Sequence, residues 1–438
     1  MKLGEVQYAK AGEHHIAFQE LVGDDGGGQD IVMVNGGFWP MGTLPDDPIA
    51  NRLLQGLAGL GRLIMFDRRG VALSDPVSDW ERPLREQWAE DLAAVIVAAG
   101  CDRPTVFSWY PFGIARTCAI LYPELIGQLV LWNPAARVGP QDMEWVAKYI
   151  EAGRRLRSGE DSNHQSGIER SRWDDPAYRA WTDAAGRAGA SPSQATRLTG
   201  KALADAPVDD TQVTTPTLVI TRWTPTMVVP EEFLSRTAQQ IPHAQHIELT
   251  PGDGFPFGIG VDEVLVEISR YLTGEVHLPA PERQIAVILF TDLVGSTRRA
   301  KSGGDAAWKL VLDRHDEVSQ TAISRRGGEV IKMTGDGVLA LFPSATAAIE
   351  AAQTIRTQLG DEDLEVRIGI HLGEIDRRGN DVSGLAVHIA SRIMGSAGAG
   401  QILASSVVAQ TTDATTFTSL GPTTLRDIDG MWEIFAAE

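Results

Sequence analysis

The sequence predicts an α/β protein with two domains: a mostly parallel sheet carrying a helical cap, followed by an α+β domain. Three observations lead to this prediction. The chain has 438 residues, well beyond the size at which a single core keeps growing. Short apolar runs alternate with helical segments over residues 1–275, as in a parallel sheet covered by helices. A polar, proline-bearing joint at 276–284 precedes a fresh apolar strand, so we expect a second domain over 285–438.

The first domain contains apolar runs of strand length, with helical segments such as 85–98 between them. The region 140–210 breaks this alternation because it is rich in Arg, Asp, Ala and Trp, and we expect it to form an inserted helical cap. The predicted strands are I-V-M-V-N (31–35), R-L-I-M-F-D (62–67), T-V-F-S (105–108), Q-L-V-L-W-N (128–133) and T-L-V-I-T (217–221).

Composition excludes several classes of function. Hydrophobic residues make up 43% and charged residues 22% of the chain, which is typical of folded proteins. A formal net charge of -19 disfavours non-specific binding to nucleic acid or to anionic membranes. No apolar run has the length of a membrane span, and the start M-K-L-G-E-V-Q-Y-A-K lacks a signal core. Cys101 and Cys118 form no disulfide framework, so we expect a cytoplasmic protein.

The second domain begins with F-T-D-L-V-G-S-T (290–297), where a buried strand ends in Asp292 and a long helix follows. A helix start offers backbone N–H groups to phosphate oxygens, and a carboxylate at the same place can hold a metal ion. We therefore expect metal binding at Asp292 and substrate contacts along this stretch. The residues concerned are Phe290, Gly295, Ser296 and Thr297. The alternative is that Asp292 merely caps the helix.

A hairpin signal follows in V-I-K-M-T-G-D-G-V-L-A-L-F (330–342), with Asp336 at the turn and Lys332 four residues before it. Taken alone, an Asp here could simply suit the turn. Together with Asp292, it gives two strand-end carboxylates, which can clamp two divalent ions about 4 Å apart.

A third motif, N-D-V-S-G-L-A-V-H-I-A-S-R-I-M-G (380–395), places Asp381 before a helix that starts near Gly384. His388 and Arg392 are four residues apart and therefore share one face of this helix. They could be a solvated pair, but Val387, Ala390 and Ile393 supply the buried face and leave His388 and Arg392 directed together elsewhere.

These three motifs, in this order, resemble the catalytic domain of the class III nucleotide cyclases, whose fold is α+β and ferredoxin-like. The resemblance covers roughly 285–438 and includes the strands V-R-I-G-I-H-L-G (366–373) and W-E-I-F-A (432–436). It implies a head-to-tail homodimer with active sites at the interface. It also implies two divalent ions, Mg²⁺ or Mn²⁺, on Asp292 and Asp336 of one subunit.

The same resemblance implies the remaining roles. Lys332 and Asp381 of the other subunit match the pair that reads the purine, and these residue types suit the adenine of ATP. Arg392 matches the arginine that stabilises charge on the phosphates in the transition state. His388 stands where the family commonly has a ribose-orienting asparagine, and an imidazole can still donate one hydrogen bond there.

The first 275 residues resemble the α/β-hydrolase fold, on the motifs V-N-G-G-F (34–38), F-D-R-R-G-V-A-L-S-D (66–75) and L-Y-P-E-L-I-G-Q-L-V-L-W-N-P (121–134). The catalytic positions of that family are changed. Tyr110 replaces the nucleophilic serine in S-W-Y-P-F (108–112), Thr224 lies near the place of the acid, and Gly254 occupies the place of the histidine. Without nucleophile, acid and base there is no proton path for hydrolysis.

The leading hypothesis is therefore an adenylyl cyclase that makes 3′,5′-cyclic AMP and pyrophosphate from ATP, with a hydrolase-like domain that senses a small apolar ligand. GTP and pyrimidine nucleotides stay open as secondary substrates. One alternative is a non-catalytic or weakly active cyclase-like signalling protein that binds a ligand through its first domain. A less favoured one is an active hydrolase, with Ser108 in the place of the missing nucleophile.

Overall fold

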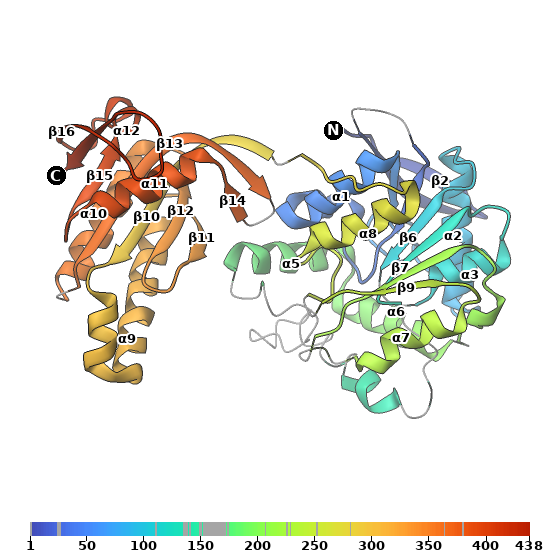
Figure 1. Ribbon diagram of the computed structural model, residues 1–438. Coiled ribbons are helices and arrows are strands. Elements are labelled where there is room, and N and C mark those ends of the chain that lie inside the picture. Colours follow the sequence, from blue (N-terminus) through green and yellow to red (C-terminus); the bar gives the residue numbers. More distant parts are fainter. Residues whose placement is uncertain are drawn as a thin grey trace. The chain divides into compact units, whose positions relative to one another are not determined.

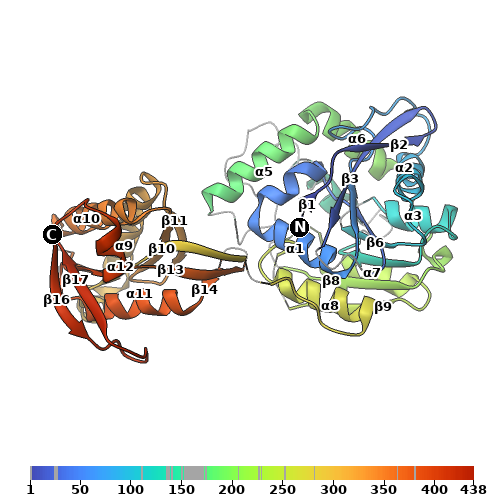
Figure 2. The same ribbon diagram turned by 90° about the horizontal axis from the view of Figure 1, so that it is seen from above.

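The protein is described here from a computed structural model, in which the chain separates into two compact units, Met1–Pro279 and Ala280–Glu438. Figures 1 and 2 show the two units from two directions. The structure describes residues 2–23, 28–109, 112–134, 139, 142–148, 151, 172, 175–205, 207–224, 227, 229–250, 253–280, 282–362, 364–378 and 381–438.

The N-terminal unit is built around a nine-stranded sheet with the order β1-β3-β5-β4-β6-β7-β8-β9 and with β2 paired to β3. The sheet is parallel from β5 through β9, while β1, β2 and β3 pair antiparallel at its start. The strands are β1 (Lys2–Leu3), β2 (Gln7–Ala11), β3 (His14–Val22), β4 (Ile31–Val34), β5 (Leu63–Phe66), β6 (Thr105–Trp109), β7 (Gln128–Trp132), β8 (Thr217–Thr221) and β9 (Gln245–Glu248).

Helices cover both faces of this sheet, because its strands are apolar on both sides. One core packs α2 (Leu84–Ala98), α3 (Ile114–Leu121) and α6 (Pro192–Ala204) on the sheet. The other packs α1 (Pro48–Leu60), α7 (Glu231–Gln240) and α8 (Val261–Thr273) on the opposite face. This unit also contains η1 (Met41–Asp46), α5 (Pro176–Gly189) and η3 (Asp210–Gln212), and the predicted cap region contains α5 and α6.

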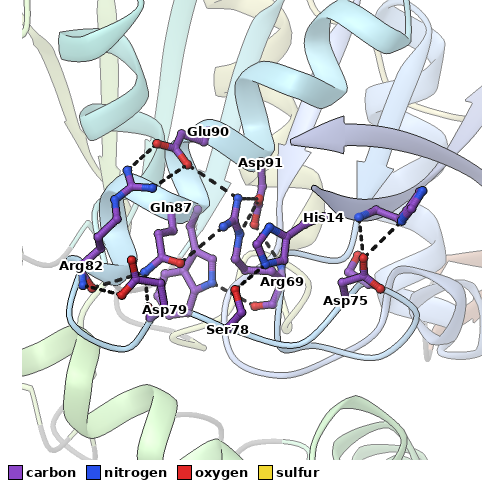
Figure 3. Close-up of polar contacts among 12 residues, drawn as sticks. His14, Arg69, Asp75, Ser78, Asp79, Arg82, Gln87, Glu90 and Asp91 are labelled. Atoms are coloured by element: carbon purple, nitrogen blue, oxygen red, sulfur yellow. Dashed lines mark hydrogen bonds and ion pairs between the residues drawn. The ribbon is translucent and has the colours of Figure 1, made fainter. Parts of the chain in front are cut away.

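A buried ion pair fixes the loop that follows β5 (Figure 3). The Arg69 Nε donates to Asp91 Oδ1 at 2.8 Å, and the Arg69 backbone N–H donates to Asp91 Oδ2 at 2.9 Å. The indole of Trp88 in turn donates to the Arg69 carbonyl at 3.0 Å. All three side chains are buried, so the F-D-R-R-G motif holds the loop to α2 and acts in packing.

The C-terminal unit is built around an eight-stranded sheet with the order β11-β12-β10-β13-β15-β17-β16 and with β14 paired to β13. The strands are β10 (Glu282–Leu293), β11 (Glu329–Met333), β12 (Val338–Phe342), β13 (Val366–Arg378), β14 (Asp381–Ser383), β15 (Ile402–Ser405), β16 (Phe417–Thr423) and β17 (Trp432–Ala437). Strand β10 starts earlier than its apolar pattern at 285, because Glu282 to Gln284 already pair with Arg377 to Ile375 on β13.

Two sets of helices cover the two faces of this second sheet. α9 (Ser296–Ser324) and α10 (Ala345–Gly360) share a core with one face, and α11 (Leu385–Ser396) packs on the other. The short α12 (Ser406–Thr411) follows β15. On the α11 side, burial lowers the pKa of His371 to about 4, and its Nδ1 lies 2.8 Å from Ser405 Oγ. Across the described ranges, no helix combines the length and the apolar character needed to cross a bilayer.

Candidate active site

The turn between β11 and β12 is fixed by its two glycines. Gly335 has a φ of +94°, a backbone conformation that L side chains rarely adopt. A Cβ on Gly337 would lie 2.1 Å from the carbonyl oxygen of Thr291, so only glycine permits this approach. Backbone geometry therefore requires both glycines of the G-D-G motif. The turn that they form places Asp336 next to the end of β10.

The two predicted metal carboxylates belong to neighbouring pieces of chain. The backbone N–H of Leu293, the residue after Asp292, donates to the Asp336 carbonyl at 2.9 Å. The Thr291 hydroxyl accepts from the Val338 N–H at 3.0 Å, and Thr291 is buried. These bonds tie the end of β10 to the turn from both sides, so the positions of the two aspartates depend on backbone contacts.

Asp292 is ion-paired with Arg367, which sits opposite it on β13. Arg367 Nε lies 2.7 Å and Nη2 lies 2.5 Å from the same oxygen, Asp292 Oδ2. Asp292 is 19% exposed and Arg367 38% exposed. The pairing of Arg367 with Asp292 was not predicted from the sequence, although a single charged residue in the apolar strand V-R-I-G-I-H is a signal that could have revealed it.

The pair of carboxylates fits a divalent ion that takes its other ligands from phosphates and water. Hard oxygen donors suit Mg²⁺ and Mn²⁺, and Mg²⁺ is commonly held by one or two protein carboxylates. Arg367 contacts only Oδ2, which leaves Oδ1 of Asp292 for an ion. Asp336 is half-buried. Among the residues described, no group of three or more His, Cys, Asp and Glu side chains could hold a metal ion.

The start of α9 follows shortly after Asp292. Gly295, with a φ of +73°, is the N-cap residue, and Ser296 is the first residue of the helix. No side chain caps this end, so its backbone N–H groups remain suited to an anion. Thr297 lies in the first turn, and its side chain is outside the described part of the structure.

Of the two residues expected to read the purine, Lys332 lies on the α11 side of the sheet. Lys332 and Phe290 both stand beside Leu339 in register, so the three share one face. Phe290 is half-buried and Lys332 is exposed. Asp381, the first residue of β14, is also exposed, and its Oδ1 accepts the Val382 N–H at 3.0 Å. Strands β11 and β14 are in contact.

The two helix residues of the third motif have different surroundings. His388 is exposed on α11. Arg392, one turn later, donates from Nε to the Arg426 carbonyl at 2.9 Å and lies 3.1 Å from Asp427 Oδ2. Within one chain the structure therefore brings Arg392 to the loop before β17. Asp427 was not anticipated from the sequence.

At the positions where an α/β hydrolase has its catalytic triad, the described residues include no serine, acid or histidine. The Gly254 carbonyl accepts hydrogen bonds from Trp132 Nε1 at 2.7 Å and from Asn133 Nδ2 at 3.0 Å. Thr224 lies in the loop after β8, and Tyr110 falls outside the described residues. Ser108, the nucleophile of the alternative hydrolase hypothesis, lies within β6 and pairs with Val34.

The fold and the site together define a domain in which paired carboxylates and a helix start can hold a divalent ion and a phosphate. No family model matches the chain. The chain is 33% identical over 119 residues to a Rhizobium meliloti protein with an adenylate cyclase name, covering 25% of this chain and 20% of that protein. It is 35% identical over 114 residues to an adenylate cyclase of Streptomyces coelicolor, covering 26% and 30%. The chain thus spans less than a third of either relative.

The N-terminal unit has its own structural neighbour. An α/β hydrolase fold protein from Chitinophaga pinensis covers 62% of this chain, which covers 98% of that protein, at 16% identity and a TM-score of 0.50. This likeness shows the fold alone. Over part of its length the chain is thus similar to adenylate cyclases, and its N-terminal unit has an α/β-hydrolase fold, in line with the two resemblances that the sequence motifs indicated.

We expect Arg367→Gln to raise the Mn²⁺ concentration needed for half-maximal cyclase activity by about 10–100-fold, the usual effect of losing a partner that orients a metal ligand. Saturating Mn²⁺ should restore most of the turnover rate, and Arg367→Lys should lie between wild type and Arg367→Gln. Metal titrations of the cyclase reaction measure this. An unchanged metal requirement in Arg367→Gln would show that the ion pair has no role in metal binding.

We expect His388→Asn to retain or raise cyclase activity, because asparagine restores the residue type common in the family. Initial rates of wild type and His388→Asn, measured side by side at saturating metal, check this. A large loss of activity in this variant would refute the view that histidine stands in for asparagine.

Proposed function

We propose that this protein is a homodimeric adenylyl cyclase that converts ATP to 3′,5′-cyclic AMP and pyrophosphate. The observation that carries the proposal is the placement of Asp292 and Asp336, joined through the Leu293-to-Asp336 backbone hydrogen bond. The identity with proteins named as adenylate cyclases supports it.

In the proposed reaction the ribose 3′-oxygen attacks the α-phosphate and pyrophosphate leaves. The protein contributes mainly positioning and electrostatics, as in other phosphoryl transfers. Asp292 and Asp336 would hold two divalent ions, which supply positive charge against the triphosphate and favour ionisation of the attacking hydroxyl. The start of α9, at Gly295 and Ser296, donates backbone N–H groups to phosphate oxygens.

The second subunit completes each site in this proposal. Lys332 donates to a purine ring nitrogen and Asp381 accepts from the 6-amino group, with Phe290 beside them. The exposure of Lys332 and Asp381 supports this role, because an exposed pair is free to meet a nucleotide held by another chain. Arg392 then neutralises charge on the phosphates, for which it must exchange its contact with Asp427.

The N-terminal unit is proposed to regulate the cyclase as a ligand-binding domain that does not hydrolyse. Gly254 cannot act as a base, and its carbonyl is already bound by Trp132 and Asn133. A ligand can shift cyclase activity only if it binds one state of the protein better than the other. We place the protein in the cytoplasm, where the free thiols of Cys101 and Cys118 are stable.

Asp292→Ala should abolish cyclic AMP formation from ATP in the presence of Mg²⁺ or Mn²⁺, because it removes one of the two carboxylates proposed to hold the ions. Losses of about a thousandfold or more are expected for an electrostatic contribution of this kind. Asp413→Ala is the matched control, since Asp413 is an exposed aspartate of the same unit. Activity persisting in Asp292→Ala would contradict the assigned metal site.

The same preparation should show no ester hydrolysis above background. Turnover of a simple ester that Ser108→Ala abolishes would contradict the regulatory role proposed for the N-terminal unit and favour a hydrolase.

A further inference from the structure

Asn35 and Trp109 are buried residues of the N-terminal unit whose polar side-chain atoms have no hydrogen-bond partner. Asn35 is 6% exposed and Trp109 is 1% exposed. Both the amide nitrogen and the amide oxygen of Asn35 are unpaired, and so is the indole Nε1 of Trp109. Buried polar groups are normally satisfied, because an unpaired one costs free energy on folding. Three unpaired atoms on two residues therefore need an explanation.

The two residues lie next to each other at the carboxyl ends of neighbouring strands. β4 and β6 are parallel neighbours, with Val34 beside Ser108, so Asn35 follows β4 where Trp109 ends β6. Ile31 and Met33 of β4, like Phe107 and Trp109 of β6, face the core of α1 and α8. Asn35 directly follows Val34, the last residue of β4, so from the alternation of side chains along a strand we infer that its amide lies on the same side as the Trp109 indole.

Aromatic rings surround this position. Trp109 stacks on Trp39 with ring centroids 5.5 Å apart, and it meets Phe257 edge-on at 5.0 Å. Phe255 contacts Trp39 at 4.8 Å. Trp181, from the cap helix α5, stacks on the Trp39 ring at 6.1 Å. Trp39 and Trp181 are only half-buried, so the cluster reaches the surface of the unit under the cap.

The unpaired groups determine the chemistry of a ligand. The Asn35 amide offers one acceptor and two donors, and Trp109 offers one donor; neither side chain carries a charge. Such a set suits an amide group, which both donates and accepts, or a carbonyl group, which accepts, and neither needs a counter-ion. The rings supply a flat apolar wall for the rest of the molecule.

We propose that Asn35 and Trp109 form the polar end of a binding site for a small, uncharged aromatic compound that carries an amide or carbonyl group. This proposal rests on the regulatory role proposed for the N-terminal unit and specifies the class of ligand that the unit would bind. Its existence can be tested without any cyclase reaction.

The first test is calorimetric titration of the full chain with phenylacetamide and, as a matched charged probe, phenylacetate. Phenylacetamide should bind and phenylacetate should bind at least about tenfold more weakly, since neither Asn35 nor Trp109 offers a cation and the nearby Arg68 already donates to the carbonyls of Asn35 and Gly37. Asn35→Leu and Trp109→Phe should each weaken phenylacetamide binding by about tenfold, the effect of one lost hydrogen bond. Asn51→Leu, on α1, is the control and should bind like wild type.

The second test separates a ligand site from a site filled by a structural water. Asn35→Leu should raise the thermal unfolding temperature of the ligand-free chain, because it replaces an unsatisfied polar group by an apolar one of similar size. A lowered unfolding temperature would indicate that Asn35 has a structural partner and would contradict the proposal. Equal binding of phenylacetamide by wild type and by Trp109→Phe, or no binding by wild type, would also overturn it. None of these results would contradict the proposed cyclase function, because that proposal depends on Asp292.

Discussion

The candidate active site depends on one backbone contact, the approach of the β11–β12 turn to the end of β10. The Thr291 carbonyl lies so close to Gly337 that no side chain at position 337 fits between them. Asp336 is carried to Asp292 as a consequence. The carboxylates therefore gain their positions from glycine and from main-chain hydrogen bonding, and Asp292 Oδ1 stays available for an ion although Oδ2 is paired with Arg367.

Charge pairing within the chain then sets the resting state of the site. Asp292 is held by Arg367, and Arg392 by Asp427. Both pairs are partly exposed, so each is weak enough to rearrange when ligands bring new charge. In the proposed dimer the nucleotide and its ions provide that charge. The N-terminal unit shows the opposite arrangement, with uncharged polar groups left unpaired among aromatic rings.

Sequence patterns predicted the fold class and the strands that bear the motifs, because apolar alternation and the G-D-G turn are local signals. They also indicated that Asp292 and Asp336 act together. They did not reveal Arg367 or Asp427, since both contacts join strands and loops far apart in the chain. Asn35 was likewise missed: its significance is the absence of a partner, which no local pattern encodes.

The most direct test of a cyclase site shared between two subunits is mixing two inactive variants, Asp292→Ala and Lys332→Ala, and measuring cyclic AMP formation. If one chain supplies the metal ligands and the other reads the purine, each mixed dimer has one intact site. The mixture should then recover up to about a quarter of wild-type activity per chain. A mixture as inactive as its two components would contradict the shared site, because both residues would then be needed on the same chain.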